Sequence, residues 1–273
     1  LPALRAFLHP RAATSLSLSC ALEDTDHPKA MTYWAAFNNA NIHAVFGLSQ
    51  QGILLCEAPD FDPNRANDLR RALSGREIIG LSGEARQIAT LRSVLGLDQT
   101  PTTYDKIEPL LRMTLDDLIV PPGPTQLRNM HNRDLPLVRD WRLAFDREVY
   151  DEGDTPDLRQ RSKDRATRMT HSGQGRLLEL DRTPVSMTAF NAALGGIVQV
   201  GSVYTPPALR GRGHARRAVA LHLAQAGETG TKSAILYSLS PAATRAYQSI
   251  GFTRIGDYAV MDFAKPVRIG DPA

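Results

Sequence analysis

Residues 205–215, Thr-Pro-Pro-Ala-Leu-Arg-Gly-Arg-Gly-His-Ala, decide how the rest of the chain is interpreted. Gly211 and Gly213 permit backbone angles that other residues avoid, so successive N–H groups can turn toward one point. The helix expected from Ala215 directs its positive end to the same point. The sequence therefore predicts an anion-binding loop, which a pyrophosphate fits best. Four basic side chains surround the loop: Arg210, Arg212, Arg216 and Arg217.

The segments around this loop alternate between strand and helix patterns. Val and Ile are frequent before the loop, which favours a strand, and apolar residues recur every three to four positions after it, which favours a helix. A continuous apolar run and a further helix that opens on Pro241 follow. The expected order is helix 134–149, helix 158–169, strands 176–180, 184–190 and 196–204, helix 215–226, strand 234–239, helix 241–250 and strand 252–263.

Two motifs resemble a known family. The spacing Arg-x-x-Gly-x-Ala, after a Val-Tyr-Thr-Pro-Pro strand end, resembles the acetyl-CoA loop of the GCN5-related N-acetyltransferase (GNAT) superfamily. Residues 236–238 (Leu-Tyr-Ser) and 246–252 (Ala-Tyr-Gln-Ser-Ile-Gly-Phe) resemble its later motif. The resemblance runs from about Gln126 to Phe263 and implies an α/β fold with a mixed sheet, the GNAT acyl-CoA N-acyltransferase fold. A Walker A loop is excluded because no Gly-Lys-Ser/Thr follows.

The resemblance also implies how acetyl-CoA is held and used. Two parallel strands that end near Thr205 and Ser238 would separate around the pantetheine arm. The N–H near Val203 would polarise the thioester carbonyl, and Tyr247 would protonate or hold the leaving sulfur. The competing interpretation of Tyr247 is a core residue of its helix. The predicted cofactor-binding residues are Val203, Tyr204, Thr205, Arg210, Gly211, Arg212, Gly213, His214, Ala215, Arg216, Ser238 and Ala243, and no metal is expected.

The chain departs from the family pattern at the position of the general base. Some members carry a catalytic Glu where this chain has Gln199, and glutamine cannot accept a proton at neutral pH. Glu148 and Glu179 are alternative bases, each also explicable as a structural residue. Ser240 and Ala243 replace the usual Asn and Ser of the later motif, which leaves the pantetheine contacts there open.

An acidic loop lies between the first two helices of the second half. Asp151, Glu152, Asp154 and Asp157 could attract a cationic amine, since that segment borders the acceptor site in this superfamily. An ordinary solvated loop explains the same residues. The sequence alone leaves both interpretations open.

The charge distribution divides the chain near Pro121–Pro122. Residues 1–122 carry 11 Lys and Arg against 14 Asp and Glu, a net charge of −3, whereas residues 123–273 carry 21 against 15, a net charge of +6. We therefore expect two domains, 1–122 and 123–273, with the anionic partner bound by the second.

The first domain is interpreted as a degenerate copy of the second. Residues 79–85, Ile-Gly-Leu-Ser-Gly-Glu-Ala, echo the strand, loop and helix of the second half, with Gly80 in the place of Arg210 and Glu84 in the place of His214. Glu84 would repel a phosphate at a helix N-terminus. We expect this domain to bind no CoA and to shape the acceptor site or support the second domain.

The predicted function is transfer of an acetyl group from acetyl-CoA to a primary amine, on a small molecule, a lysine or a protein N-terminus. The rivals are a non-catalytic acyl-CoA sensor, which Gln199 favours, and an aminoacyl-tRNA-dependent transferase. The latter predicts a broad basic groove, so we expect no nucleic-acid partner. No apolar stretch has the ~18 residues of a membrane span. With no apparent secretory signal and only Cys20 and Cys56, we expect a cytoplasmic protein.

Overall fold

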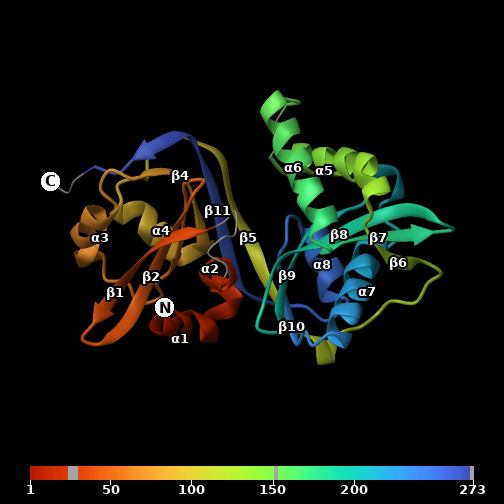
Figure 1. Cartoon of the computed structure of the whole chain (residues 1–273), viewed down its shortest axis with the longest axis horizontal. Helices are drawn as coiled ribbons and strands as arrows, with labels where there is room; N and C mark the ends of the chain where they lie inside the picture. Colours follow the sequence, from red (N-terminus) through yellow and green to blue (C-terminus); the bar gives the residue numbers. More distant parts are fainter. Residues whose placement is uncertain (24–29, 151–152, 271–273) are drawn as a thin grey trace. The chain divides into compact units, whose positions relative to one another are not determined.

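The computed structural model describes residues 1–23, 30–150 and 153–270 and forms two compact units (Figure 1). Unit 1 comprises Leu1–Leu110 and Gly256–Ala273, and unit 2 comprises Leu111–Ile255. This division differs from the predicted boundary at Pro121–Pro122, because both prolines belong to unit 2. The end of the chain returns to unit 1, where Tyr258–Asp262 pairs antiparallel with Gly80–Glu84.

Unit 1 begins with two helices and continues with strands and helices in alternation. The elements are α1 (Pro2–Leu8), α2 (Ala12–Glu23), β1 (Met31–Asn38), β2 (Asn41–Ser49), β3 (Ile53–Glu57), α3 (Ala66–Leu73), β4 (Glu77–Glu84), α4 (Ala85–Val94), β5 (Thr102–Thr114) and β11 (Thr253–Arg268). Its strand order is β1-β2-β3-β4-β11-β5. Strands β5 and β11 also contribute residues to unit 2.

Unit 2 contains the elements expected for the second half. These are β6 (Gln126–Asn129), α5 (Leu135–Tyr150), α6 (Pro156–His171), β7 (Gly175–Leu180), β8 (Thr183–Leu194), β9 (Ile197–Tyr204), α7 (His214–Glu228), β10 (Ser233–Tyr237) and α8 (Pro241–Gln248). Its strand order is β10-β9-β8-β7-β6, with β9 and β10 parallel and the other pairs antiparallel. The result is a mixed sheet in an α/β fold.

Each unit buries its sheet between two pairs of helices. In unit 2, Val219 of α7 and Ile250 after α8 pack with Val198 on one face, while α5 and α6 pack on the other face through Val138 and Ala166. In unit 1, one apolar cluster joins α3 and α4 to the sheet and a second joins α1 and α2 to it. Apolar residues on both faces of a strand are typical of such a covered sheet.

Both units place their elements in the same order: two helices, three antiparallel strands, a helix, a parallel strand, a helix and a further strand. In this order β4 and α4 correspond to β10 and α8. The predicted equivalence of Gly80 with Arg210 and of Glu84 with His214 is therefore wrong. The counterpart of the loop before α7 is the segment between β3 and α3, residues 58–65.

Among the described residues, no helix combines the length and the apolar character needed to cross a membrane.

Candidate active site

Strands β9 and β10 separate after a short parallel ladder. Ser233–Ile235 pairs with Ile197–Gln199, and no later pair joins these two strands in the described residues, although β9 continues to Tyr204. Backbone groups beyond Gln199 therefore face a gap between the strand ends. Such a gap suits an extended ligand that pairs with a strand edge.

A β-bulge lies on β9 within this gap. Ala189 of β8 faces Gly201 and Met187 faces Tyr204, so Thr188 faces both Ser202 and Val203. Ser202 has a φ of 52°, which is rare for a non-glycine residue. A bulge redirects the backbone next to functional sites. Sequence patterns did not reveal it, because Gly-Ser-Val continues the strand pattern.

The loop between β9 and α7 has the predicted glycine geometry. Gly211 has a φ of 76° and Gly213 a φ of 79°, and Gly213 is the N-cap residue of α7. No side chain caps this helix, and its first turn contains no acidic residue. The N–H groups of the first turn therefore remain available to an anion, and the helix dipole favours negative charge there.

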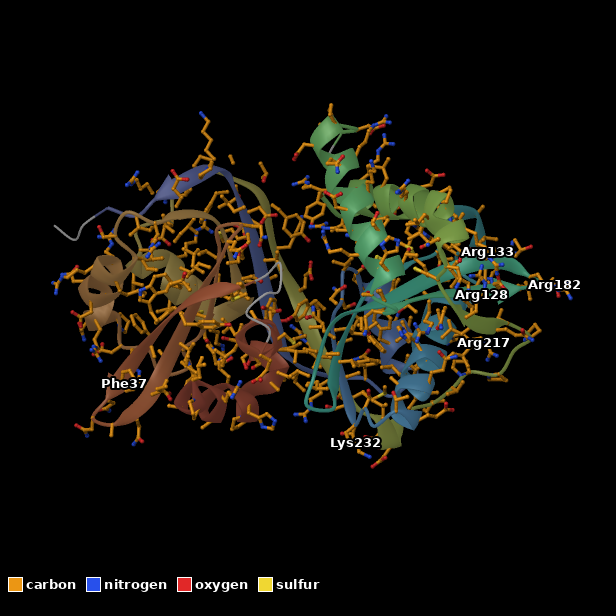
Figure 2. All side chains as sticks on the ribbon, in the orientation of Figure 1. Phe37, Arg128, Arg133, Arg182, Arg217 and Lys232 are labelled. Carbon is orange, nitrogen blue, oxygen red and sulfur yellow. The ribbon has the colours of Figure 1, made fainter. Side chains whose placement is uncertain are left out.

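The four arginines around the loop do not act alike. Arg210 Nη2 donates to both carboxylate oxygens of Glu148 at 2.8 and 2.7 Å, and its Nε donates to the Thr205 carbonyl at 2.9 Å. Arg217, on α7 (Figure 2), donates to the carbonyls of Pro121 and Gly123 and to the Thr125 hydroxyl. These two guanidinium groups hold the protein together, which corrects the prediction that Arg210 is free for the cofactor.

Arg212 and Arg216 are exposed beside the loop. Arg216 Nη1 makes one long hydrogen bond, 3.3 Å, to the Ser249 hydroxyl. His214 is buried, and burial followed by the charge of Arg212 lowers its pKa, so its imidazole is neutral at pH 7. The positive charge that remains for a ligand is thus carried by Arg212 and Arg216.

Side chains at the end of β9 are fixed from below. The Ser186 hydroxyl donates to the Tyr204 carbonyl at 2.9 Å and lies 2.9 Å from the Thr205 hydroxyl. Val203 is half-buried against the cluster that contains Tyr247. Ser186 was not among the predicted residues, since a strand serine carries no motif signal.

The end of β10 forms the second wall of the gap. The Ser238 side chain is buried and accepts a hydrogen bond from the Thr244 hydroxyl at 2.8 Å. The Ser240 hydroxyl accepts from the Ala243 N–H at 3.2 Å and so caps α8. Ser240 thus takes a structural role that the family's usual Asn leaves open here, and Ala243 contributes apolar surface.

Tyr247 lies on α8 and is 8% exposed. Its ring contacts Phe252 edge to face at 6.1 Å between centroids. Burial raises the pKa of its hydroxyl, which therefore stays protonated at neutral pH. A protonated hydroxyl can donate to a leaving anion.

Neither candidate carboxylate base stands free. Glu148, at the end of α5, is held by Arg210. Glu179, on β7, accepts from Arg128 Nε at 2.7 Å on the far side of β8, away from the gap. Gln199 is buried in the ladder between β10 and β8. Glu179 is thus a structural residue of the β6–β7 edge.

The predicted acidic loop is partly neutralised. Asp154 accepts two hydrogen bonds from Arg159 at 2.7 and 2.5 Å. Asp157 starts α6 with its side chain 82% exposed. Asp151 and Glu152 lie outside the described residues. The attraction of this loop for an amine is therefore weaker than four free carboxylates would provide.

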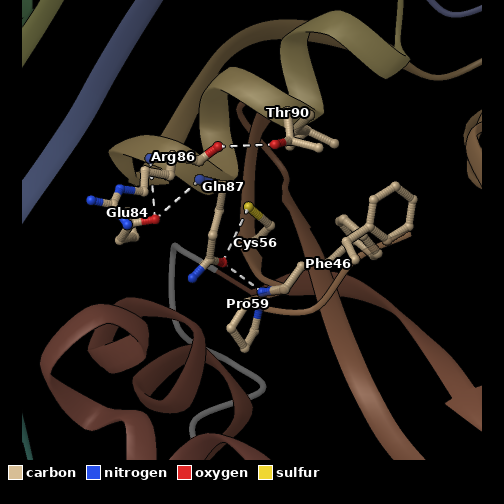
Figure 3. A pocket seen from close by; sticks show the side chains of 10 residues that line it. Phe46, Cys56, Pro59, Glu84, Arg86, Gln87 and Thr90 are labelled. Atoms are coloured by element: carbon tan, nitrogen blue, oxygen red, sulfur yellow. Dashed lines mark hydrogen bonds between the residues drawn. The ribbon is translucent and has the colours of Figure 1, made fainter. Parts of the chain in front are cut away.

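Unit 1 has a corresponding gap that is filled. Strands β3 and β4 pair only through Ile53–Leu55 and Gly80–Ser82. The Gln87 side chain then enters between them, and its Oε1 accepts from the Ala58 N–H at 2.5 Å (Figure 3). The Glu84 carboxylate accepts from the first N–H groups of α4. A cavity of about 330 Å³ remains, lined by Phe46, Cys56, Ala58, Pro59, Phe61, Glu84, Arg86, Gln87, Thr90 and Leu91.

In the described part of the chain, no group of three or more His, Cys, Asp or Glu side chains could hold a metal ion.

Comparison with known proteins gives the family of unit 2. Residues 135–252 match the sequence model of the acetyltransferase (GNAT) family. None of the curated proteins compared with the chain matches it.

Solved structures resemble nearly the whole chain. A GCN5-related N-acetyltransferase from Kribbella flavida is 18% identical, covers 93% of this chain and 95% of its own, and has a TM-score of 0.62. A GNAT-family acetyltransferase from Colwellia psychrerythraea is 12% identical, covers 95% and 97%, and has a TM-score of 0.56. At these identities the likeness establishes the fold. With the sequence match at 135–252, the chain thus carries an acetyltransferase domain of the GNAT family, whose members transfer acyl groups from acyl-CoA.

Proposed function

We propose that the chain transfers the acetyl group of acetyl-CoA to a primary amine and that unit 2 alone holds the donor. The observation that carries this proposal is the junction of an open strand gap with the uncapped start of α7. A pyrophosphate would accept hydrogen bonds from the loop and first-turn N–H groups of residues 211–215. Arg212 and Arg216 would add charge-assisted bonds.

The pantetheine arm would lie in the gap between β9 and β10. Backbone groups of Val203 and Thr205 would pair with it as a neighbouring strand does. Ser238 and Ala243 would form the opposite wall. Arg210 supports this arrangement indirectly, since it ties the loop end at Thr205 to α5 through Glu148.

Acetyl-CoA supplies the thioester that the amine attacks. The amine nitrogen forms a bond to the carbonyl carbon, the carbon–sulfur bond breaks, and sulfur leaves with the electron pair. The N–H of Val203 stabilises the negative charge on the carbonyl oxygen. Tyr247 gives its proton to the sulfur, and its raised pKa keeps that proton available at neutral pH.

The attacking amine must lose protons without a free protein carboxylate. Glu148 is engaged by Arg210, and Gln199 is not a base. We propose that water takes these protons and that the amine enters neutral. The rate is then expected to rise with pH until it passes the pKa of the acceptor amine itself.

The test is a thiol-release screen of the whole chain with acetyl-CoA and a panel of amines: polyamines, aminoglycosides, amino sugars and lysine peptides. Thiol release that depends on one amine class supports the proposal. Tight CoA binding with no thiol release from any amine would instead support the acyl-CoA sensor. Retention of full CoA affinity in Arg212→Ala would contradict the position of the donor site.

A further inference from the structure

A buried cluster of charges lies on the side of unit 2 where α5 and α6 cover the sheet. Asp146 of α5 is 0% exposed and Arg142, one turn earlier, is 6% exposed. Arg142 donates through Nε to Asp146 Oδ2 at 3.0 Å and through Nη2 to Oδ1. The pair is thus fully enclosed and bidentate.

Helix α6 completes the shell of Asp146. The Ser162 hydroxyl donates to Oδ2 at 2.7 Å, and Arg165 Nη1 donates to Oδ1 at 3.0 Å. Four donors therefore satisfy one carboxylate. Buried charges are costly, and replacing such clusters by apolar residues is often neutral or stabilising. Stability alone gives little reason to place two charges here.

The remaining arm of Arg142 reaches the β-bulge of β9. Its Nη1 donates to the Ser202 hydroxyl at 2.8 Å, in a buried hydrogen bond. Ser202 is the residue with a φ of 52°, an angle that persists only where neighbouring groups hold it. The next residue is Val203. The Arg142 contact therefore acts on the backbone immediately before the N–H that faces the donor gap.

We propose that Arg142 is a positioning residue for the oxyanion-stabilising N–H of Val203 and that Asp146 holds Arg142 in place. This inference rests on the proposed function. By fixing the Ser202 side chain, Arg142 sets the bulge geometry and hence the direction of the following N–H group. Stabilisation of an oxyanion depends on such preorganised donors. Arg142 itself does not touch the reacting atoms.

The sharpest variant is Ser202→Ala, which removes one oxygen and leaves the Arg142–Asp146 pair intact. Arg142→Lys is the second variant, because a single ammonium cannot serve both partners. The matched control is Arg128→Lys at the β6–β7 edge. Arg128 also bridges two carboxylates, of Asp134 and Glu179, but does not contact β9.

The first readout needs no acceptor. Infrared spectra of bound acetyl-CoA, labelled with ¹³C at the thioester carbonyl, report the hydrogen bond to that oxygen. We expect the band to lie at lower frequency in the native protein and in Arg128→Lys. In Ser202→Ala and Arg142→Lys it is expected to shift toward the value in water-free solvent, with acetyl-CoA affinity within twofold of native.

The second readout is thiol release with the best amine found. We expect kcat to fall about tenfold in Ser202→Ala and Arg142→Lys at unchanged KM for acetyl-CoA, because small displacements of a catalytic group cost rate. A merely structural cluster would lower Tm in all three variants without moving kcat or the band.

An unmoved band and kcat in Ser202→Ala would overturn the positioning role while leaving the proposed function standing. Failure of the native protein to bind acetyl-CoA would overturn both. A native protein that binds acetyl-CoA but shows no lowered carbonyl band would also overturn the positioning role.

Discussion

The two units share an order of elements but differ at their strand gaps. In both, a parallel pair of strands is joined over three residues and then separates. In unit 2 the gap leads to a glycine loop and an uncapped helix, whereas in unit 1 Gln87 enters the gap and bonds to Ala58.

The loops before the following helices differ in charge. Residues 205–213 contain two arginines and two glycines, and residues 58–65 contain Asp60, Asp62 and Arg65 but no glycine. The fold thus supplies a gap between strands in each unit. Whether that gap can receive a phosphorylated ligand depends on the few side chains and backbone angles at its mouth.

The largest expected effect concerns a pair of buried tyrosines, one in each unit. Tyr247→Phe is expected to lower kcat about 100-fold, because it removes the proton donor for the leaving sulfur. Its stability should change little, since no hydrogen bond of the Tyr247 hydroxyl is found among the described residues. Thiol-release kinetics and thermal unfolding measure the two quantities.

Tyr33→Phe in unit 1 is the matched control. The Tyr33 hydroxyl donates to the Leu18 carbonyl at 2.6 Å, so its loss should cost about 1 kcal/mol of stability with kcat unchanged. An active Tyr247→Phe with normal kcat would remove Tyr247 from the mechanism.

The next effect concerns charge at the two loops. Arg212→Ala should weaken CoA binding about tenfold, because one charge-assisted hydrogen bond to phosphate is lost. Arg65→Ala, at the corresponding loop of unit 1, should leave the affinity unchanged, since Arg65 already pairs with Asp68. Calorimetric titration with CoA measures both. Equal losses in the two variants would contradict a single donor site.

The units should also respond oppositely to mild acid. The pKa of His222 in unit 2 is lowered to about 3 by burial and by Arg176, so folding favours its neutral form. As pH falls below 6.5 the unfolded chain binds the proton first and unit 2 loses stability, about 1 kcal/mol between pH 6.5 and 5.5.

In unit 1, burial raises the pKa of Glu57, so its protonation stabilises the folded unit as pH falls toward the ordinary range of a carboxyl group. Hydrogen exchange followed by peptide mass spectrometry separates the two units. His222→Phe should remove the acid sensitivity of unit 2. An unchanged pH slope in that variant would refute the assignment.

The smallest expected effect is that of reopening unit 1. Gln87→Ala should not create a second CoA site, because Asp60, Asp62 and the Glu84 cap remain at its mouth. CoA stoichiometry is the measurement. Two CoA molecules per chain would show that Gln87 alone separates the units.

The sequence predicts much of unit 2 because its signals are local. Glycine at 211 and 213 and the apolar spacing of α7 depend on residues within a few positions. Both appear in the structure as expected.

The partners of charged side chains were not predictable in this way. Arg210 meets Glu148, which is 62 residues away in sequence, and Arg217 meets a loop more than 90 residues away. Only the tertiary fold decides which arginines remain free for a ligand.

Two further features escaped the sequence for the same reason. Arg142 and Asp146 have the spacing of an exposed helical ion pair, and nothing local indicates that the pair is buried. Gly80 suggested a loop, but Gly80 lies within β4 and pairs with Asp262 near the other end of the chain. Glycine in a strand and glycine in a turn look alike until the partner strand is known.

The most direct test of the central claim is hydrogen exchange of the whole chain with and without CoA, read together with binding stoichiometry. The account predicts one CoA per chain and protection confined to residues 199–217 and 236–247. Protection in residues 54–66 of unit 1, or no protection at the start of α7, would contradict it.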